Sequence, residues 1–176
     1  PPKMTVSNIL SAMKRPHWAL NTLINGQPSF EILKPYMQKN LNLNQLAKFM
    51  DATFSGRLNE DKIKRIRDLW KGKLVLKGAE SIHDVEKAYQ LGLDGVVISN
   101  HGGRQVDVGQ ATIDSLNSIV PLYKDKIKVM MDSGIRGGAD VARVMASGAD
   151  FSFMGRTFMY GVSALGKKGG NHTIAM

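Results

Sequence analysis

The sequence predicts an α/β fold in which four strands and their helices form half of an eight-stranded TIM (β/α)8 barrel. From residue 73 onward, short apolar runs alternate with amphipathic helical patterns, which is typical of a parallel sheet. The runs are continuously apolar, as expected when both faces of a sheet are covered. The residues at the predicted strand ends, Lys77, His101, Asp132 and Gly155, are 24, 31 and 23 positions apart. These intervals come close to, and do not exceed, the roughly 31 residues per unit of a roughly 250-residue barrel.

The first 56 residues are predicted to be a lid or insertion that carries short helices and is not an independent domain. Prolines at positions 1, 2, 16, 28 and 35 divide this stretch into short pieces. Weak helical patterns lie at Val6–Met13, His17–Leu23 and Leu43–Met50. Residues 57–176 are predicted to hold the four βα units, truncated in the last helix.

A clearer helix is predicted over residues 59–71. Ile63, Ile66 and Trp70 recur on one face at helical spacing. Asn59 is the expected N-cap residue, and Gly72 is the expected stop.

The remaining pattern predicts four strands, at Leu74–Leu76, Gly95–Ile98, Ile127–Met131 and Phe151–Met154. Helices are predicted from Ser81 to Gly92, with Asp84 completing a capping box, and over residues 111–122 and 139–147. Their inward side chains are expected to be Ile82, Val85, Ala88, Tyr89, Ile113, Leu116, Ile119 and Val120.

A faint internal repeat joins the two pairs of βα units. Lys73–Lys77 resembles Lys128–Asp132, 55 positions later, and Gly92–Asp94 resembles Gly148–Asp150, 56 positions later. A single period of this kind fits a duplicated quarter of a barrel.

The composition is that of one globular domain, with 176 residues of which 43% are hydrophobic and 22% charged. The chain has no cysteine, which excludes disulfides and thiolate chemistry, and no metal site is predicted. No apolar run approaches the roughly 20 residues of a membrane span, and no signal peptide is evident. A cytoplasmic location is therefore expected.

The net charge of +9 is distributed unevenly. Residues 1–76 hold 13 Lys/Arg and 5 Asp/Glu, a balance of +8, whereas residues 77–176 hold 11 and 10, a balance of +1. Such asymmetry is found on surfaces that meet nucleic acid, anionic lipid or an acidic partner. A solvated helical surface is the commoner explanation.

Polar side chains gather at the carboxyl end of each predicted strand. Lys77 follows the first strand, Ser-Asn-His-Gly-Gly-Arg-Gln follows the second at residues 99–105, and Asp132 follows the third. In barrel enzymes this rim holds the active site. His101 can move a proton near neutral pH, and Arg104 can hold a carboxylate with two parallel hydrogen bonds. The pair points to chemistry on a small organic acid.

Two glycine-rich strand ends each carry an arginine: Asp-Ser-Gly-Ile-Arg-Gly-Gly at residues 132–138, and Gly155 with Arg156. Free backbone amides ahead of a helix, together with arginine, form a phosphate cradle. In barrels that cradle commonly follows strands seven and eight. The four strands are therefore assigned as strands 5–8, the second half of the barrel.

Lys77, the segments 99–105 and 132–136, and the Gly155–Arg156 pair resemble the FMN-dependent α-hydroxy-acid oxidase and dehydrogenase family. This family includes glycolate oxidase, lactate oxidase, L-lactate dehydrogenase and mandelate dehydrogenase. The resemblance is strong over residues 73–176 and loose before them. It implies a flavoprotein oxidoreductase with FMN as cofactor, which oxidises a small L-2-hydroxy acid to the 2-oxo acid.

The resemblance also implies a role for each matching residue. His101 would be the base that takes a proton from the substrate's hydroxyl or α-carbon, and Arg104 would clamp the substrate carboxylate. Lys77 would lie beside N1 and the C2 carbonyl of the flavin, where its charge stabilises the reduced ring. Ser99 would contact the flavin. The ribityl chain and phosphate would be held by Asp132, Ser133, Gly134, Ile135, Arg136, Gly155 and Arg156.

The family also has a first half-barrel, which supplies further substrate tyrosines, a second arginine and an aspartate that orients the catalytic histidine. These parts are absent from the 176 residues, which are therefore expected to be an internal fragment, inactive as a monomer. Two open sheet edges would favour aggregation, or pairing with another copy or with the missing half. The full-length family form is expected to be a homo-oligomer. The individual hydroxy acid and the electron acceptor (oxygen, a quinone or a cytochrome) stay open.

Two other functions are kept as alternatives. Another FMN- or phosphate-binding barrel, such as an isomerase or a nucleotide dehydrogenase, would share the phosphate cradle but would not need the His101–Arg104 pair. A nucleic-acid or membrane-surface binder would use residues 1–76, which lack the clustered basic and aromatic pattern of such binders. No nucleic-acid partner is expected, and peripheral membrane contact is kept as a secondary role.

Overall fold

The computed structural model describes residues 5–26, 30–37, 41, 43–53 and 58–176. The chain divides into two compact units, residues 1–57 and residues 58–176. The predicted boundary between residues 56 and 57 lies outside the described residues, as do the prolines at positions 1, 2 and 28.

The first unit contains the helices α1 (Val6–Met13), α2 (Pro16–Asn25) and α3 (Leu43–Thr53). All three predicted helices are confirmed. A short 3₁₀ helix, η1 (Glu31–Tyr36), was not predicted, because six residues with an internal proline give no readable helical period.

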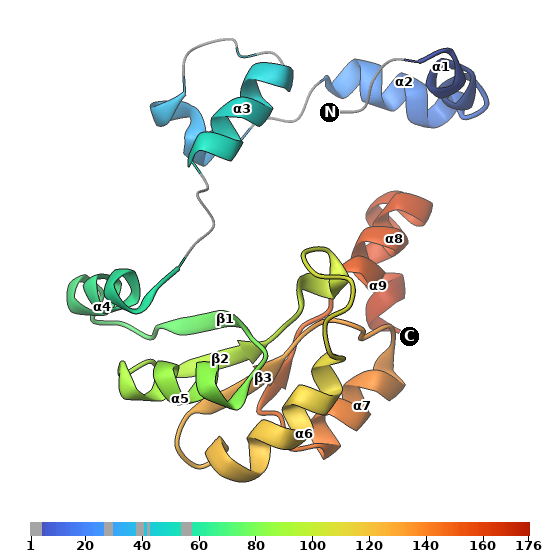
Figure 1. Ribbon diagram of the computed structural model, residues 1–176. Helices are drawn as coiled ribbons and strands as arrows, with labels where there is room; N and C mark the ends of the chain where they lie inside the picture. Colours follow the sequence, from blue (N-terminus) through green and yellow to red (C-terminus); the bar gives the residue numbers. More distant parts are fainter. Residues whose placement is uncertain (1–4, 27–29, 38–40, 42, 54–57) are drawn as a thin grey trace. The chain divides into compact units, whose positions relative to one another are not determined.

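The second unit is built around a four-stranded parallel sheet with the order β1-β2-β3-β4, as the alternating pattern predicts (Figure 1). The predicted helix after the fourth strand is present, whereas the two elements that follow it were not predicted. The elements in chain order are α4 (Glu60–Leu69), β1 (Val75–Ala79), α5 (Ile82–Gln90), β2 (Gly95–Ile98), η2 (His101–Gly103), α6 (Thr112–Tyr123), β3 (Lys128–Met131), α7 (Gly138–Ala146), β4 (Phe151–Ser152), α8 (Arg156–Leu165), η3 (Gly166–Lys168) and α9 (Gly169–Ile174).

The hydrophobic core lies between the sheet and the helices α5, α6 and α7, which cover one of its faces (Figure 1). Each fully buried aliphatic side chain contributes about 1.5–3 kcal/mol. The predicted inward residues Val85, Ala88, Leu116, Ile119 and Val120 are buried, and Ile113 is partly buried.

The inward prediction is wrong for Ile82 and Tyr89, which are 41% and 47% exposed. Both lie on the same edge of the apolar stripe of α5. The helix instead turns its other edge, with Ala88 and the neighbouring Leu91, toward the core.

The prediction that both faces of the sheet are covered holds for β2, whose four residues are all buried, but is wrong for β1 and β4. Val75 on β1 and Phe151 on β4 are 43% and 55% exposed, and Phe153, just after β4, is 44% exposed. In a closed barrel, side chains from the facing strands fill the interior, whereas these four strands form an open sheet. Strand β4 is also shorter than predicted, with two residues.

Helix α4 begins as predicted, because the Asn59 side chain accepts a hydrogen bond from the Lys62 amide at 3.0 Å. Its predicted end is wrong, since the helix stops at Leu69 and Trp70 is extended. Arg67 donates to the carbonyl oxygens of Trp70 and Gly72, so a side chain closes the helix before the glycine is reached.

The internal repeat corresponds to two equivalent carboxylate contacts between neighbouring strands. Asp94 accepts from the Leu74 amide at 2.9 Å and from Lys73 Nζ at 2.8 Å. Asp150 accepts from the Val129 amide at 2.9 Å and from Lys128 Nζ at 2.7 Å. Each aspartate precedes one strand and binds the start of its neighbour, at the end of the sheet opposite the predicted site.

Candidate functional site

The loop after β2 forms a left-handed turn that presents the predicted base. His101, Gly102 and Gly103 have φ angles of 57°, 70° and 73°. Glycine adopts this conformation freely, whereas a histidine there costs about 1 kcal/mol or more. The turn persists because side-chain oxygens of Ser99, Ser133 and Asn100 accept from the three successive amides at 3.2, 3.0 and 3.1 Å.

A polar network joins β1 to the ends of β2 and β3. Lys77 was predicted to follow the first strand, but it lies inside β1, which continues to Ala79. Lys77 Nζ donates to Ser99 Oγ at 2.7 Å and forms an ion pair with Asp132. Ser133 Oγ donates to the other carboxylate oxygen of Asp132 at 2.8 Å. Burial raises the pKa of Asp132, but hydrogen bonds from Lys77, Ser99 and Ser133 outweigh it and hold that pKa below its ordinary value. Asp132 is therefore a carboxylate at neutral pH.

The fourth strand end is tied to the same loop. Arg156, the first residue of α8, donates from Nη2 to the Gly102 carbonyl at 3.0 Å. Thr157 donates to the Ile135 carbonyl at 3.3 Å, and Asp140 accepts from the Arg136 amide at 3.0 Å. These bonds fix the two glycine-rich strand ends beside the His101 loop.

Ten of the eleven predicted site residues line one hollow of about 240 Å³ at the carboxyl ends of the strands. The eleventh, Ser99, is buried and accepts a hydrogen bond from Lys77, which lines the hollow. The ten are Lys77, His101, Arg104, Asp132, Ser133, Gly134, Ile135, Arg136, Gly155 and Arg156.

Three further residues line this hollow that sequence analysis did not select: Gly102, Phe153 and Met159. Phe153 could have been selected from the sequence, because it stands two positions after Phe151. The two rings pack edge-on, with 5.0 Å between their centres. Met159 lies in α8, the last predicted helix, for which sequence analysis named no inward-facing residues.

The charges around the hollow favour an anionic ligand. Four cationic side chains line it, from Lys77, Arg104, Arg136 and Arg156, against the single carboxylate of Asp132. Across the described ranges, no three His, Asp or Glu side chains gather closely enough to hold a metal ion. The lining therefore suits a molecule with more than one negative group.

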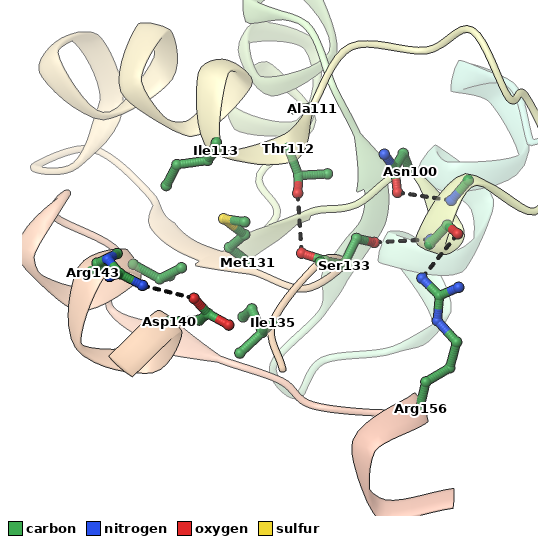
Figure 2. Close-up of a pocket in the computed structure, with 14 residues that line it drawn as sticks. Asn100, Ala111, Thr112, Ile113, Met131, Ser133, Ile135, Asp140, Arg143 and Arg156 are labelled. Carbon is green, nitrogen blue, oxygen red and sulfur yellow. Dashed lines mark hydrogen bonds and ion pairs between the residues drawn. The ribbon is translucent and has the colours of Figure 1, made fainter. Parts of the chain in front are cut away.

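A second hollow of about 420 Å³, which sequence analysis did not predict, also has Ser133 in its lining (Figure 2). Ile113, Met131 and Val144 give it an apolar lining, and Arg143 pairs with Asp140 at 3.0 Å beside it. It shares five residues with the first hollow: Gly102, Ser133, Gly134, Ile135 and Arg156.

Comparison with known proteins gives a consistent result. The model of the FMN-dependent dehydrogenase family matches residues 1–176. L-lactate dehydrogenase of Bartonella quintana (strain Toulouse) is 38% identical over 174 residues, covering 98% of this chain and 45% of that protein. L-lactate dehydrogenase of Vibrio cholerae (strain M66-2) is 35% identical over 169 residues, covering 96% and 45%.

Comparison with solved structures finds enzymes that act on mandelate. The monotopic membrane protein (S)-mandelate dehydrogenase superposes with a TM-score of 0.88 at 30% identity, covering 98% of this chain and 45% of that one. A mandelate oxidase with benzoyl-formic acid gives a TM-score of 0.64 at 33% identity, covering 67% and 35%. The chain thus spans about half the length of the relatives it matches.

Proposed function

Because this chain belongs to the FMN-dependent dehydrogenase family, we propose that it supplies the cofactor and base half of an enzyme that oxidises a small L-2-hydroxy acid to the 2-oxo acid. The family's cofactor is FMN. The relatives reported above are L-lactate dehydrogenases, and the similar solved structures are those of mandelate enzymes. The observation that carries the proposal is that Lys77, His101, Arg104, Arg136 and Arg156 line a single hollow.

The residues of the hollow fit FMN. Arg136 and Arg156 offer guanidinium groups for a phosphate, and Gly155 stands at the N-terminus of the ten-residue helix α8, where backbone amides favour an anion. A Cβ atom built on Gly134 or on Gly155 would have no neighbour within 4 Å, so a ligand can approach the backbone there. Lys77 places a cation for the flavin ring. When bound, FMN accepts the two electrons that the substrate loses.

The chain's own residues would handle the proton and the carboxylate. Arg104 would bind the substrate carboxylate through two parallel hydrogen bonds and so fix the orientation of the α-carbon. His101 would take the proton from the hydroxyl or the α-carbon as general base. Fixed cations beside the negative charge that develops lower the barrier by about a few kcal/mol.

The experiment is a substrate panel on the purified protein at its natural length, loaded with FMN. L-lactate, glycolate and (S)-mandelate are mixed with it anaerobically, and the loss of the visible flavin absorbance is timed. We expect at least one of the three to reduce the flavin. Reduction by none of them, together with reduction by NADH or a nucleotide, would favour the alternative of another FMN-binding barrel.

We also propose that residues 6–25 attach the protein peripherally to anionic membranes. Among the described residues, α1 and α2 have no buried side chain, and Val6, Met13, Leu23 and Ile24 are all more than two-thirds exposed. Lys14 and Arg15 separate the two helices, a combination typical of interfacial helices. The structural neighbour is described as monotopic.

No helix in the described parts is long and apolar enough to cross a bilayer. Sedimentation with phosphatidylglycerol vesicles tests the membrane proposal. We expect the protein to bind these vesicles, and salt to weaken the binding. The double variant Leu23→Ser, Ile24→Ser is expected to bind them less. Vesicles of phosphatidylcholine are expected to bind little protein. Equal sedimentation with both lipids, or none with either, would contradict it. The cytoplasmic location stays a prediction.

Finally, we propose that these 176 residues by themselves, as a monomer, do not oxidise a hydroxy acid. They provide four parallel strands and match about 45% of the length of relatives such as the Bartonella enzyme. Substantial lactate oxidation by a monodisperse 176-residue monomer with added FMN would refute this. A homo-oligomeric full-length form remains a prediction, and the sequence predicts no particular electron acceptor.

A further inference from the structure

The peptide units on either side of Gly102 are held by two side chains from other βα units. The Gly102 amide donates to Ser133 Oγ at 3.0 Å, and the Gly102 carbonyl accepts from Arg156 Nη2 at 3.0 Å. Figure 2 shows Ser133 and Arg156 with both interactions dashed. The residue before Gly102 is His101, so its backbone is constrained at the same point.

We propose that Ser133 is a positioning residue for His101, an inference that rests on the catalytic role proposed above for that histidine. The hydroxyl of Ser133 donates to Asp132 at 2.8 Å while it accepts from the Gly102 amide. The Ser133 hydroxyl thereby joins the Lys77–Asp132 ion pair to the backbone of the turn at residues 101–103.

Ser133 differs from the other two side chains that accept from this turn. Ser99 and Asn100 lie within three residues of the amides they bind, whereas Ser133 is 31 residues away from Gly102 and follows the next strand. Local contacts define the shape of the turn. A contact with a distant part of the chain, such as that of Ser133, also sets the turn's position relative to Asp132 and Arg136.

The backbone at Ser133 supports a specific need for its hydroxyl. Its φ angle is 74°, a conformation that favours glycine and strains a serine. Glycine would relieve the strain but would remove both hydrogen bonds. A side chain retained at such a position is expected to do something that glycine cannot do.

The resemblance that places Ser133 among the contacts of the ribityl chain and phosphate makes a different prediction. A ribityl contact would affect FMN affinity, and flavin reduction would be normal once FMN is saturating. A positioning residue would leave FMN affinity nearly unchanged and would slow flavin reduction at saturating FMN and substrate.

The experiment compares Ser133→Ala, Ser133→Gly and Ser118→Ala in the purified protein at its natural length. Ser118 also donates from its hydroxyl, to the Asp114 carbonyl at 3.0 Å, but it lies on α6 outside the site. For each variant we measure the FMN dissociation constant, the KM and limiting rate of flavin reduction by L-lactate, and hydrogen exchange of the Gly102 amide with and without FMN.

Both Ser133 variants are expected to reduce the flavin about 10–100-fold more slowly, with KM and FMN affinity within about 3-fold of wild type. Their Gly102 amide is expected to exchange at least 10-fold faster even without FMN, and Ser118→Ala is expected to match wild type. Ser133→Gly relieves the backbone strain, so a rate loss in that variant cannot come from misfolding at this residue.

Weaker FMN binding with a normal limiting rate would overturn the inference, as would unchanged Gly102 exchange. If wild-type protein reduces no flavin with any hydroxy acid, the proposed function fails. The exchange measurement without FMN then still decides whether Ser133 holds the turn.

Discussion

Arg104 is exposed beside His101, on the loop that the strand ends hold in place. Its proposed task depends on geometry as well as charge, because guanidinium offers two parallel donors and ammonium does not. We predict that Arg104→Lys raises KM for L-lactate about 10–100-fold with a smaller effect on kcat, as expected for the loss of one charge-assisted hydrogen bond of about 1.5–3 kcal/mol.

Steady-state kinetics of the FMN-loaded enzyme check this prediction. Arg65→Lys, on the exposed surface of α4, is the matched control and is expected to leave KM unchanged. A wild-type KM for Arg104→Lys would remove Arg104 from the binding of the carboxylate.

At this scale the sequence predicted which residues gather at the site better than how they are connected. The strand-end rule selected ten of the thirteen residues that line the hollow, because parallel strands align their carboxyl ends. It did not predict that Ser133 and Arg156 would bind Gly102. Those bonds depend on the φ angles of two loops that come together only in the folded chain.

At the scale of the helices and strands, too, the sequence predicted positions better than surroundings. Periodicity located helices α1 to α7 and all four strands, but it misjudged the exposure of β1 and β4, because an apolar run does not reveal what covers its second face. It gave no bounds for α8 and did not predict α9, and both helices contain glycines, which lower helix propensity.

The strand starts contain a carboxylate whose ionisation stabilises the fold. Hydrogen bonds from Lys73 and from the Leu74 amide lower the pKa of Asp94 from 3.8 to about 2. Because the unfolded chain holds this proton more tightly, the contribution of Asp94 is complete above about pH 4 and is lost as the pH falls toward 2. Asp94→Asn is predicted to be less stable at pH 6 and to lose less stability between pH 4 and pH 2.

Urea unfolding midpoints at pH 6, 4, 3 and 2 test this prediction. Asp150→Asn, at the equivalent position of the repeat, is expected to behave similarly, and the exposed Asp114→Asn is expected to follow wild type. Parallel pH curves for wild type and Asp94→Asn would contradict the assignment.

Helices α8 and α9 approach closely through glycines. A Cβ atom on Gly169 would overlap the carbonyl of Gly161, whereas one on Gly170 would have no neighbour within 4 Å. Gly169→Ala is therefore predicted to cost about 1–3 kcal/mol of unfolding free energy by overpacking. Gly170→Ala is the adjacent control and should not destabilise. Equal unfolding midpoints for the two variants would show that the helices do not meet at Gly169.

At the scale of the molecule, the two units divide the chemistry. Residues 58–176 hold every residue of the candidate site, and residues 1–57 hold α1 and α2 with their exposed apolar side chains. Lys14 and Arg15, between α1 and α2, supply the positive charge for the membrane role proposed for these two helices. The strand-end cations serve a small anionic ligand instead.

The most direct test of the proposed chemistry is the anaerobic visible spectrum of the FMN-loaded protein at its natural length, before and after L-lactate, for wild type and His101→Gln. We predict that lactate bleaches the flavin band of wild type. His101→Gln should bind FMN equally well but bleach at least about 1,000-fold more slowly, since it lacks the base. Bleaching of His101→Gln at the wild-type rate would contradict the account.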